Sequence, residues 1–192
     1  MSDKKRCGWV EGQFDDYIRY HDEEWGVPVH EDQKHFEFLI LEGAQAGLSW
    51  ATVLKKREGY KAAFANFNAV EVSKFDEKKI RSLLTFDGII KNQFKIRATV
   101  NNAQRFLEVQ EEFNGFDNYI WQFVDGEPIV NHWKDISEVP ATSTESDTLS
   151  KDLKKRGFKF VGSTIIYAHM QACGLVNDHT VDCFRYHEVG AS

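Results

Sequence analysis

LSKDLKKRGFKFVGSTIIYAHMQACG, residues 149–174, predicts two helices joined by a short hairpin. A charged helix runs to Arg156, and Gly157 is placed to end it in a left-handed conformation. Ser163 is placed to cap the second helix. The apolar face of this second helix carries Ile166, Met170 and Cys173. We therefore expect a hairpin element at about residues 146–173.

Helical patterns continue outward from the hairpin toward the N-terminus. A stripe with spacings of four, three and four residues is formed by Ile96, Val100, Ala103 and Leu107. Asp32 and Ser49 are placed to cap two helices, and residues 43–47 are expected to interrupt the first helix before the second begins. Asn68, with Glu71 three residues later, resembles a capping box. With no run that alternates with period two, the sequence predicts an all-α fold.

Length and composition fit one compact helical domain over residues 1–192, since domains run to roughly 100–200 residues. The formal charge of −6 excludes a protein that holds nucleic acid by bulk charge, but it allows a local basic patch. Three cysteines are too few for a disulfide scaffold. The N-terminal MSDKKRCGWV lacks the apolar run of a signal peptide, and nothing approaches a membrane span. We expect a cytoplasmic protein with reduced thiols.

The hairpin is locally basic. Residues 151–159 carry five basic side chains against Asp152, a surplus of four positive charges. Glycines on both sides of the turn let backbone amides face outward, and the second helix begins there, so its N–H groups could hold a phosphate. The alternative is an ordinary solvated helix face. The candidate DNA contacts are Lys155, Arg156, Gly157, Lys159, Gly162 and Ser163.

Four candidate metal ligands lie at opposite ends of the chain. Cys7 and His21 are near the N-terminus, and His179 and Cys183, four residues apart, are near the C-terminus. Two thiols and two imidazoles form a set that Zn²⁺ prefers in a closed tetrahedral site. The alternative is a surface thiol, a loop histidine and two packing residues. A metal that joined the termini would close a loop of most of the chain.

Aromatic side chains gather near one carboxylate. Glu42 ends an otherwise apolar run, where a carboxylate is paired, exposed or aimed at a cationic ligand. Aromatic walls and one anion suit a flat, positively charged ring. The alternative is that the aromatics are core residues and Glu42 is solvated. The candidate substrate-binding residues are Trp9, Tyr17, Tyr20, Trp25, Glu42 and Trp50.

Long blocks of this chain resemble the family of 3-methyladenine DNA glycosylase I. The similarity runs from Cys7 to about Tyr186, and the blocks that carry it are RCGWV, YHDEEWGVP, LEGAQAGLSWATVLKKRE and LKKRGFKFVGSTIIYAHMQACGLVNDH. The resemblance implies the helix-hairpin-helix DNA repair superfamily. It also implies one structural Zn²⁺ per chain on the four Cys and His ligands, and a base pocket at Glu42 and the aromatic residues. Most of the superfamily uses an aspartate after the hairpin, but this family is described without one, so Asp178 is not assigned as catalyst.

The resemblance further implies a monofunctional, monomeric bacterial enzyme. It would bind double-stranded DNA that contains alkylated bases, hydrolyse the N-glycosidic bond of 3-methyladenine and release the free base, leaving an abasic site. Glu42 is the candidate catalytic residue, and we expect it mainly to discriminate the lesion from adenine. No lysine is placed for a Schiff base, so no strand-nicking step is expected. Residues 46–48 are candidates for the wedge that fills the gap left by a flipped base.

Two other functions fit parts of the pattern. One is a protein that binds alkylated DNA without cutting the glycosidic bond. The other is a zinc hydrolase, which the closed Cys₂His₂ set disfavours because a catalytic zinc keeps an open position. Release of free base from methylated DNA separates the first of these from a glycosylase.

Overall fold

Most of the chain is helical in the computed structural model, which describes residues 4–189, so the ends of the expected 1–192 domain lie outside the described residues. The α-helices are α1 (Asp15–Glu23), α2 (Asp32–Gln45), α3 (Trp50–Leu54), α4 (Arg57–Ala63), α5 (Ala69–Ser73), α6 (Glu77–Leu84), α7 (Gln93–Phe113), α8 (Phe116–Ile120), α9 (Thr144–Lys155), α10 (Ser163–Ala172) and α11 (Arg185–Val189). Short 3₁₀ turns cover Gly8–Val10, Ala65–Phe67, Trp121–Val124 and Ile136–Glu138. None of these helices is long and apolar enough to cross a membrane.

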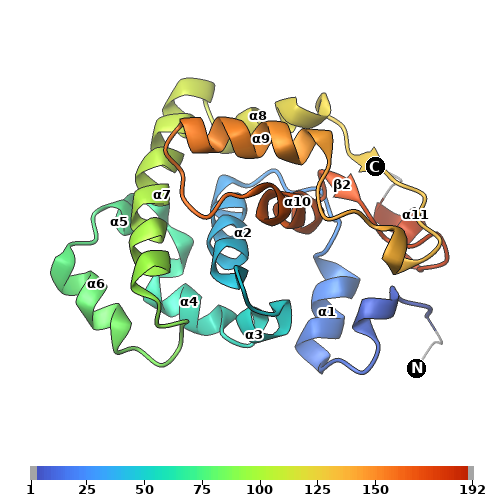
Figure 1. Ribbon diagram of the computed structural model, residues 1–192, viewed down its shortest axis with the longest axis horizontal. Coiled ribbons are helices and arrows are strands. Elements are labelled where there is room, and N and C mark those ends of the chain that lie inside the picture. Colours follow the sequence, from blue (N-terminus) through green and yellow to red (C-terminus); the bar gives the residue numbers. More distant parts are fainter. Residues whose placement is uncertain (1–3, 190–192) are drawn as a thin grey trace.

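Helices α2 and α10 occupy the centre of the molecule, with α7, α9 and α1 around them (Figure 1). Helix α2 is buried along most of its length between His35 and Ala44, which is typical of a helix surrounded by other elements. The expected interruption at residues 43–47 is therefore wrong in part, because α2 continues through Gly43 to Gln45. A core of apolar side chains from both ends of the chain joins these elements into one compact domain.

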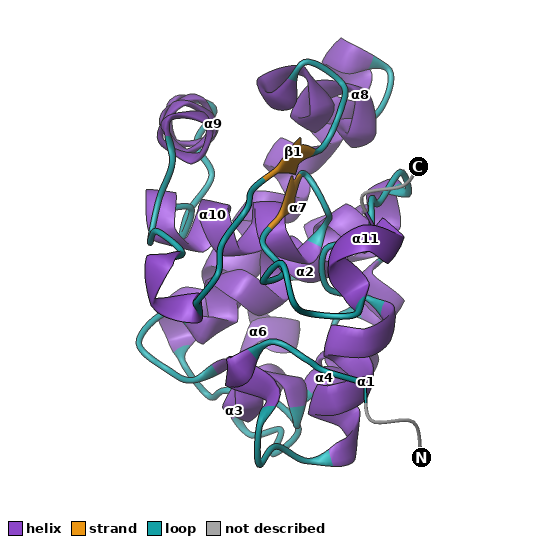
Figure 2. Cartoon of the chain, turned by 90° about the vertical axis from the view of Figure 1, so that its right-hand side faces the viewer, coloured by secondary structure: helices purple, strands orange, loops and turns teal. Residues whose placement is uncertain are grey.

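One short parallel strand pair departs from the expected all-α pattern. Strand β1 (Ile129–Val130) pairs with β2 (Val176–Asn177), Ile129 opposite Val176 (Figure 2). Two residues are too few for a period of two to show in the sequence. The pair ties the connector before α9 to the segment that follows α10, and so helps to position the C-terminal residues of the candidate site.

Two of the expected caps are corrected by the structure. The Asp32 carboxylate accepts the backbone N–H groups of Phe116 and Asp117 at 2.9 and 2.8 Å, so it caps α8, while Glu31 precedes α2. Gly162, rather than Ser163, is the residue before α10. Ser49 and Asn68 do cap α3 and α5 through their side chains, although Asn68 does so without the reciprocal bond of a capping box.

Candidate base pocket, metal-ligand cluster and hairpin

Helices α1, α2 and α3 bring an aromatic box to the carboxylate of Glu42. Tyr17 and Tyr20 lie three residues apart on one face of α1, and the ring centroids of Tyr20 and Trp50 are 5.2 Å apart. Glu42 is 3% exposed. Burial, together with the negative charge of Glu42, raises the pKa of both tyrosines. We call Tyr17, Tyr20, Glu42 and Trp50 the α1–α3 box.

The polar groups of the α1–α3 box lack partners. Burial alone raises the pKa of Glu42 to about 8, with no hydrogen bond or counter-charge from residues 4–189 to offset it. The indole N–H of Trp50 is also buried without an acceptor in the described chain. Unpaired buried polar groups are costly and uncommon in folded proteins, so an acceptor and a donor left free in one box indicate a ligand site.

Trp9 and Trp25, also predicted for the pocket, pack against the candidate metal ligands. The ring of Trp9 meets those of His21 and Trp25 edge-on at centroid distances of 5.1 and 5.0 Å. Trp25 contacts His179 in the same way at 4.6 Å. Trp9 also contacts Tyr17 of the box at 5.4 Å. Trp9 therefore lies between the α1–α3 box and the ligand cluster, and Trp25 packs beside it against the cluster.

The four predicted metal ligands come together and are buried; we call Cys7, His21, His179 and Cys183 the terminal cluster. The Cys7 and Cys183 sulfurs each lie 3.5 Å from His179 Nδ1, and the Cys183 sulfur lies 3.5 Å from His21 Nε2. The second nitrogen of each ring also has a partner. His21 Nδ1 is 2.8 Å from Asp22, and His179 Nε2 is 3.0 Å from the Trp25 carbonyl. The cluster could hold a metal ion and has the outer partners that metal-bound imidazoles have.

Asp178, beside the terminal cluster, is fully buried and saturated with donors. Asn131 and Trp133 donate to one carboxylate oxygen, both at 2.7 Å. Tyr167 and Gln171 donate to the other at 2.6 and 2.8 Å. A carboxylate whose lone pairs are all in use has none free for a water molecule, so the geometry gives Asp178 a structural role.

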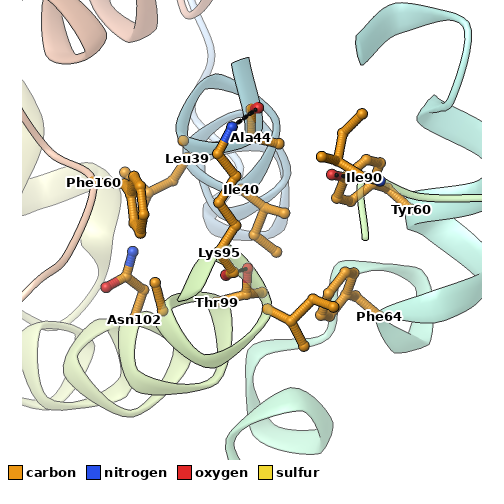
Figure 3. A pocket seen from close by; sticks show the side chains of 13 residues that line it. Leu39, Ile40, Ala44, Tyr60, Phe64, Ile90, Lys95, Thr99, Asn102 and Phe160 are labelled. Carbon is orange, nitrogen blue, oxygen red and sulfur yellow. Dashed lines mark hydrogen bonds between the residues drawn. The ribbon is translucent and has the colours of Figure 1, made fainter. Parts of the chain in front are cut away.

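Lys95 holds the end of α2, two residues beyond Glu42. Its ammonium group donates to the Ala44 carbonyl at 2.8 Å (Figure 3). It also donates to the Ala46 carbonyl at 2.7 Å, where a helix leaves carbonyl groups unpaired. A cavity of about 20 Å³ lies beside this contact, against the face formed by Leu39, Ile40 and Gly43. Lys95 therefore fixes the end of α2, and no pattern in the sequence marks it for that role.

The hairpin between α9 and α10 is held from behind by polar side chains that the sequence analysis missed. Asn101 donates to the Gly157 carbonyl at 2.9 Å, and Asn102 bonds both backbone groups of Lys159 at 2.8 and 2.9 Å. The Ser150 hydroxyl donates to the Val161 carbonyl at 2.6 Å. The signal that could have found them is an asparagine pair within the apolar stripe of α7.

The predicted DNA contacts differ in availability. Lys155 and Lys159 are exposed, and Gly157 has a φ of +90°. The Arg156 guanidinium forms ion pairs with Asp152 and Glu112, both at 2.6 Å, and lies over the rings of Phe113 and Tyr119. The Ser163 hydroxyl bonds to Asp147, and Gly162 precedes α10. The structure therefore gives Arg156 intramolecular partners that the sequence did not show.

Comparison with known proteins places this geometry in one family. The methyladenine glycosylase family model matches residues 9–186. DNA-3-methyladenine glycosylase 1 of Escherichia coli is 50% identical over 182 residues, which cover 95% of this chain and 97% of that protein. A crystal structure of 3-methyladenine DNA glycosylase I has a TM-score of 0.91 at 48% identity, covering 94% of this chain and 98% of that one. A variant of such an enzyme, solved in complex with 3-methyladenine, has a TM-score of 0.90 at 34% identity, covering 93% and 96%. The chain belongs to the methyladenine glycosylase family.

Proposed function

We propose that this protein is a monofunctional DNA-3-methyladenine glycosylase. It hydrolyses the N-glycosidic bond of 3-methyladenine in alkylated double-stranded DNA, releases the free base and leaves an abasic site. The observation that carries the proposal is Glu42, a carboxylate 3% exposed that stands among aromatic rings without a donor. The relatives named above, one of them solved with 3-methyladenine bound, support it.

The α1–α3 box fits a flat cation. A base alkylated at a ring nitrogen carries a positive charge in DNA, and the carboxylate of Glu42 complements that charge and accepts hydrogen bonds from the base. Tyr17, Tyr20 and Trp50 offer ring faces for stacking, worth about 1–3 kcal/mol per base. A neutral adenine gains the stacking but not the charge contact.

The same charge drives the chemistry. A cationic base is already a good leaving group, so the enzyme needs little acid catalysis once the nucleotide is flipped out. Water attacks the sugar carbon and loses a proton to solvent, the C–N bond breaks, and its electron pair leaves with the base, which departs neutral. Glu42 selects and holds the base rather than attacking the sugar.

The hairpin binds the phosphate backbone of DNA. We assign the phosphate contacts to the exposed Lys155 and Lys159 and to the backbone of Gly157, Gly162 and Ser163, as a helix-hairpin-helix element. Arg156 supports the hairpin from within instead. Leu48, 41% exposed in the turn after α2, is the wedge candidate among residues 46–48.

The terminal cluster takes a structural Zn²⁺. Two thiolates and two imidazoles are a closed donor set for this ion, and their sulfur–nitrogen separations of 3.5 Å match ligands of one tetrahedral centre at about 2.0–2.3 Å from the metal. A bound ion would join the chain's two ends. The catalytic unit is a monomer, because one chain contains the box, the cluster and the hairpin.

The test is chromatography of bases released from methylated duplex DNA. We expect the wild-type chain to release 3-methyladenine, Glu42→Ala to release little, and a strand break to appear only after chemical treatment of the abasic site. DNA binding without any base release would show a lesion-binding protein instead. Loss of excision on brief exposure to a chelator, with the fold intact, would favour a zinc hydrolase.

A further inference from the structure

A second group of metal-ligating side chains lies between α2 and α10. His35, His169 and Cys173 are 0%, 1% and 0% exposed, and each offers a ligand atom within 4.8 Å of the other two. His169 and Cys173 are one helical turn apart, and the Cys173 sulfur is 3.6 Å from His169 Nε2. We call these three residues the inner cluster.

The inner cluster leaves imidazole nitrogens without partners. His35 Nδ1 and His169 Nδ1 are buried and have no hydrogen-bond partner in the part of the chain described. The other nitrogen of His35, Nε2, lies 3.4 Å from a carboxylate oxygen of Asp117. A carboxylate at Nε2 favours the tautomer with the proton on that nitrogen, and His35 Nδ1 then carries a free lone pair.

The distances between ligand atoms in the inner cluster can be compared with those in the terminal cluster. Its sulfur–nitrogen separations are 3.5 Å, against 3.6 Å for Cys173 and His169. Zn–S and Zn–N bonds of about 2.3 and 2.0 Å hold two ligands about 3.5 Å apart at a tetrahedral angle. The third ligand atom, within 4.8 Å, reaches the same ion after a shift of about 1 Å.

We propose that the inner cluster is a second zinc site, with the Cys173 thiolate and one nitrogen each from His35 and His169 as ligands. The thiolate and the Asp117 carboxylate balance the two charges of the ion. The ion would link α2, which carries His35, to α10, which carries His169 and ends before Cys173. Glu42 lies seven residues beyond His35 on the same helix, so the site would also brace the helix that carries the pocket carboxylate.

The alternative is a hydrogen bond from the Cys173 thiol to His169, in which His35 does not take part. A zinc site uses all three residues and takes up the free lone pair of His35. The number of zinc ions per chain separates the two. This count rests on the zinc proposed above for the terminal cluster: with that ion bound, the alternative gives one zinc per chain and the inner cluster raises the number to two.

The experiment counts zinc per chain by elemental analysis after loading with Zn²⁺ and exhaustive dialysis without chelator. We expect two equivalents for wild type and one for His169→Phe and His35→Leu, which keep much of the side-chain volume and remove the ligand. His187→Phe, an exposed histidine in neither cluster, is the control and should keep two.

A wild-type count of one, or an unchanged count in both His169→Phe and His35→Leu, would overturn the proposal. Circular dichroism checks that each variant folds, and the wild-type count decides the question if neither variant does. The count does not depend on base excision, so this proposal and the proposed glycosylase activity can fail separately.

Discussion

The region around the terminal cluster and the α1–α3 box treat buried polar groups in opposite ways. Asp178 accepts four hydrogen bonds, and both imidazoles of the terminal cluster have outer partners. In the box, Glu42 is also buried and accepts none, and the indole N–H of Trp50 has no acceptor among the described residues. Satisfied groups stabilise the fold, whereas unsatisfied ones cost free energy that a ligand can recover.

This contrast assigns roles that residue type alone does not. Asp178 and Glu42 are both buried carboxylates, yet only Glu42 has lone pairs free for a substrate. The contrast predicts that changes in the satisfied region lower stability and leave the chemistry intact, while changes in the box weaken function and relieve the cost of unpaired groups.

The largest effect is expected from Cys183→Ser, which removes one of four ligands from the terminal cluster. We expect this site to lose its zinc, and the free energy of unfolding to fall on the order of 5 kcal/mol or more. The melting temperature should then fall by about 10–20 °C, as measured by calorimetry beside zinc analysis. If Cys183→Ser instead kept its zinc and melted at the wild-type temperature, Cys183 would not be a ligand and the terminal cluster would not owe its stability to a metal.

Asp178→Asn should come next. The new amide places an NH₂ group against two of the four donors that the carboxylate accepts, so those hydrogen bonds are lost, at a cost of about 2–4 kcal/mol. Base excision per folded molecule, measured well below the melting temperature, should stay within about threefold of wild type, because Asp178 has no lone pair free for water. A loss of excision by about three or more orders of magnitude in a protein that is still folded would make Asp178 the catalytic base, because about 4 kcal/mol or more exceeds the 1–3 kcal/mol of one hydrogen bond.

Glu42→Gln should lower function and raise stability. A hydrogen bond to a charged group is worth about 1–3 kcal/mol, so the preference for 3-methyladenine over adenine should fall about five- to a hundredfold. Trp50→Ala is the matched variant, since it should weaken binding of both bases and keep most of the preference. Titration of the two free bases into each variant measures this.

The pH dependence of the same variant gives a second readout. The pKa of Glu42 is about 8 in the folded protein against 4.5 for the free group, so the folded state binds the proton more tightly. The contribution of Glu42 to stability should therefore be largest below the lower value, fall by about 1.4 kcal/mol for each pH unit between the two, and stay low above the higher one. Glu42→Gln should lack that fall. Parallel profiles of the unfolding free energy would show that Glu42 is solvated.

Much of this division could be predicted from sequence, and part of it could not. The terminal cluster follows from residue types that Zn²⁺ prefers and from a resemblance that covers most of the chain. The helix stripe at residues 96–107 appears as α7, because a period of three and four is a local property. The pairing of β1 with β2 was missed because two-residue strands leave no period to detect.

Partners far apart in sequence account for the remaining errors. Asp32 looks like a cap for its own helix, yet it caps α8, more than eighty residues away. Cys173 looks like one more apolar position of a helix face, and its neighbour His35 comes from α2. A local pattern shows which side chains share a face but not which other helix meets that face.

The smallest effect separates two adjacent basic residues of the hairpin, Lys155 and Arg156, and tests the same rule at the surface. Lys155 is exposed, whereas Arg156 pairs with Asp152 and Glu112. We expect Lys155→Glu to weaken DNA binding alike on all sequences and to reduce the salt slope by about 1, without a change in the melting temperature. Lys151→Glu, one turn earlier on α9, is the control for a general change in charge.

Arg156→Glu should give the reverse pattern, because a paired guanidinium is already occupied. Reversal of its charge puts three carboxylates together, so the melting temperature should fall by a few degrees, at a cost of about 1 kcal/mol for a partly exposed network. Its salt slope for DNA binding should stay near that of Lys151→Glu, since no phosphate contact is lost. If Arg156→Glu instead flattened the slope as much as Lys155→Glu, the guanidinium would leave its partners on DNA. At this surface, intramolecular partners would then not show that a residue is structural. The contrast between the paired Asp178 and the unpaired Glu42 would apply only to buried side chains.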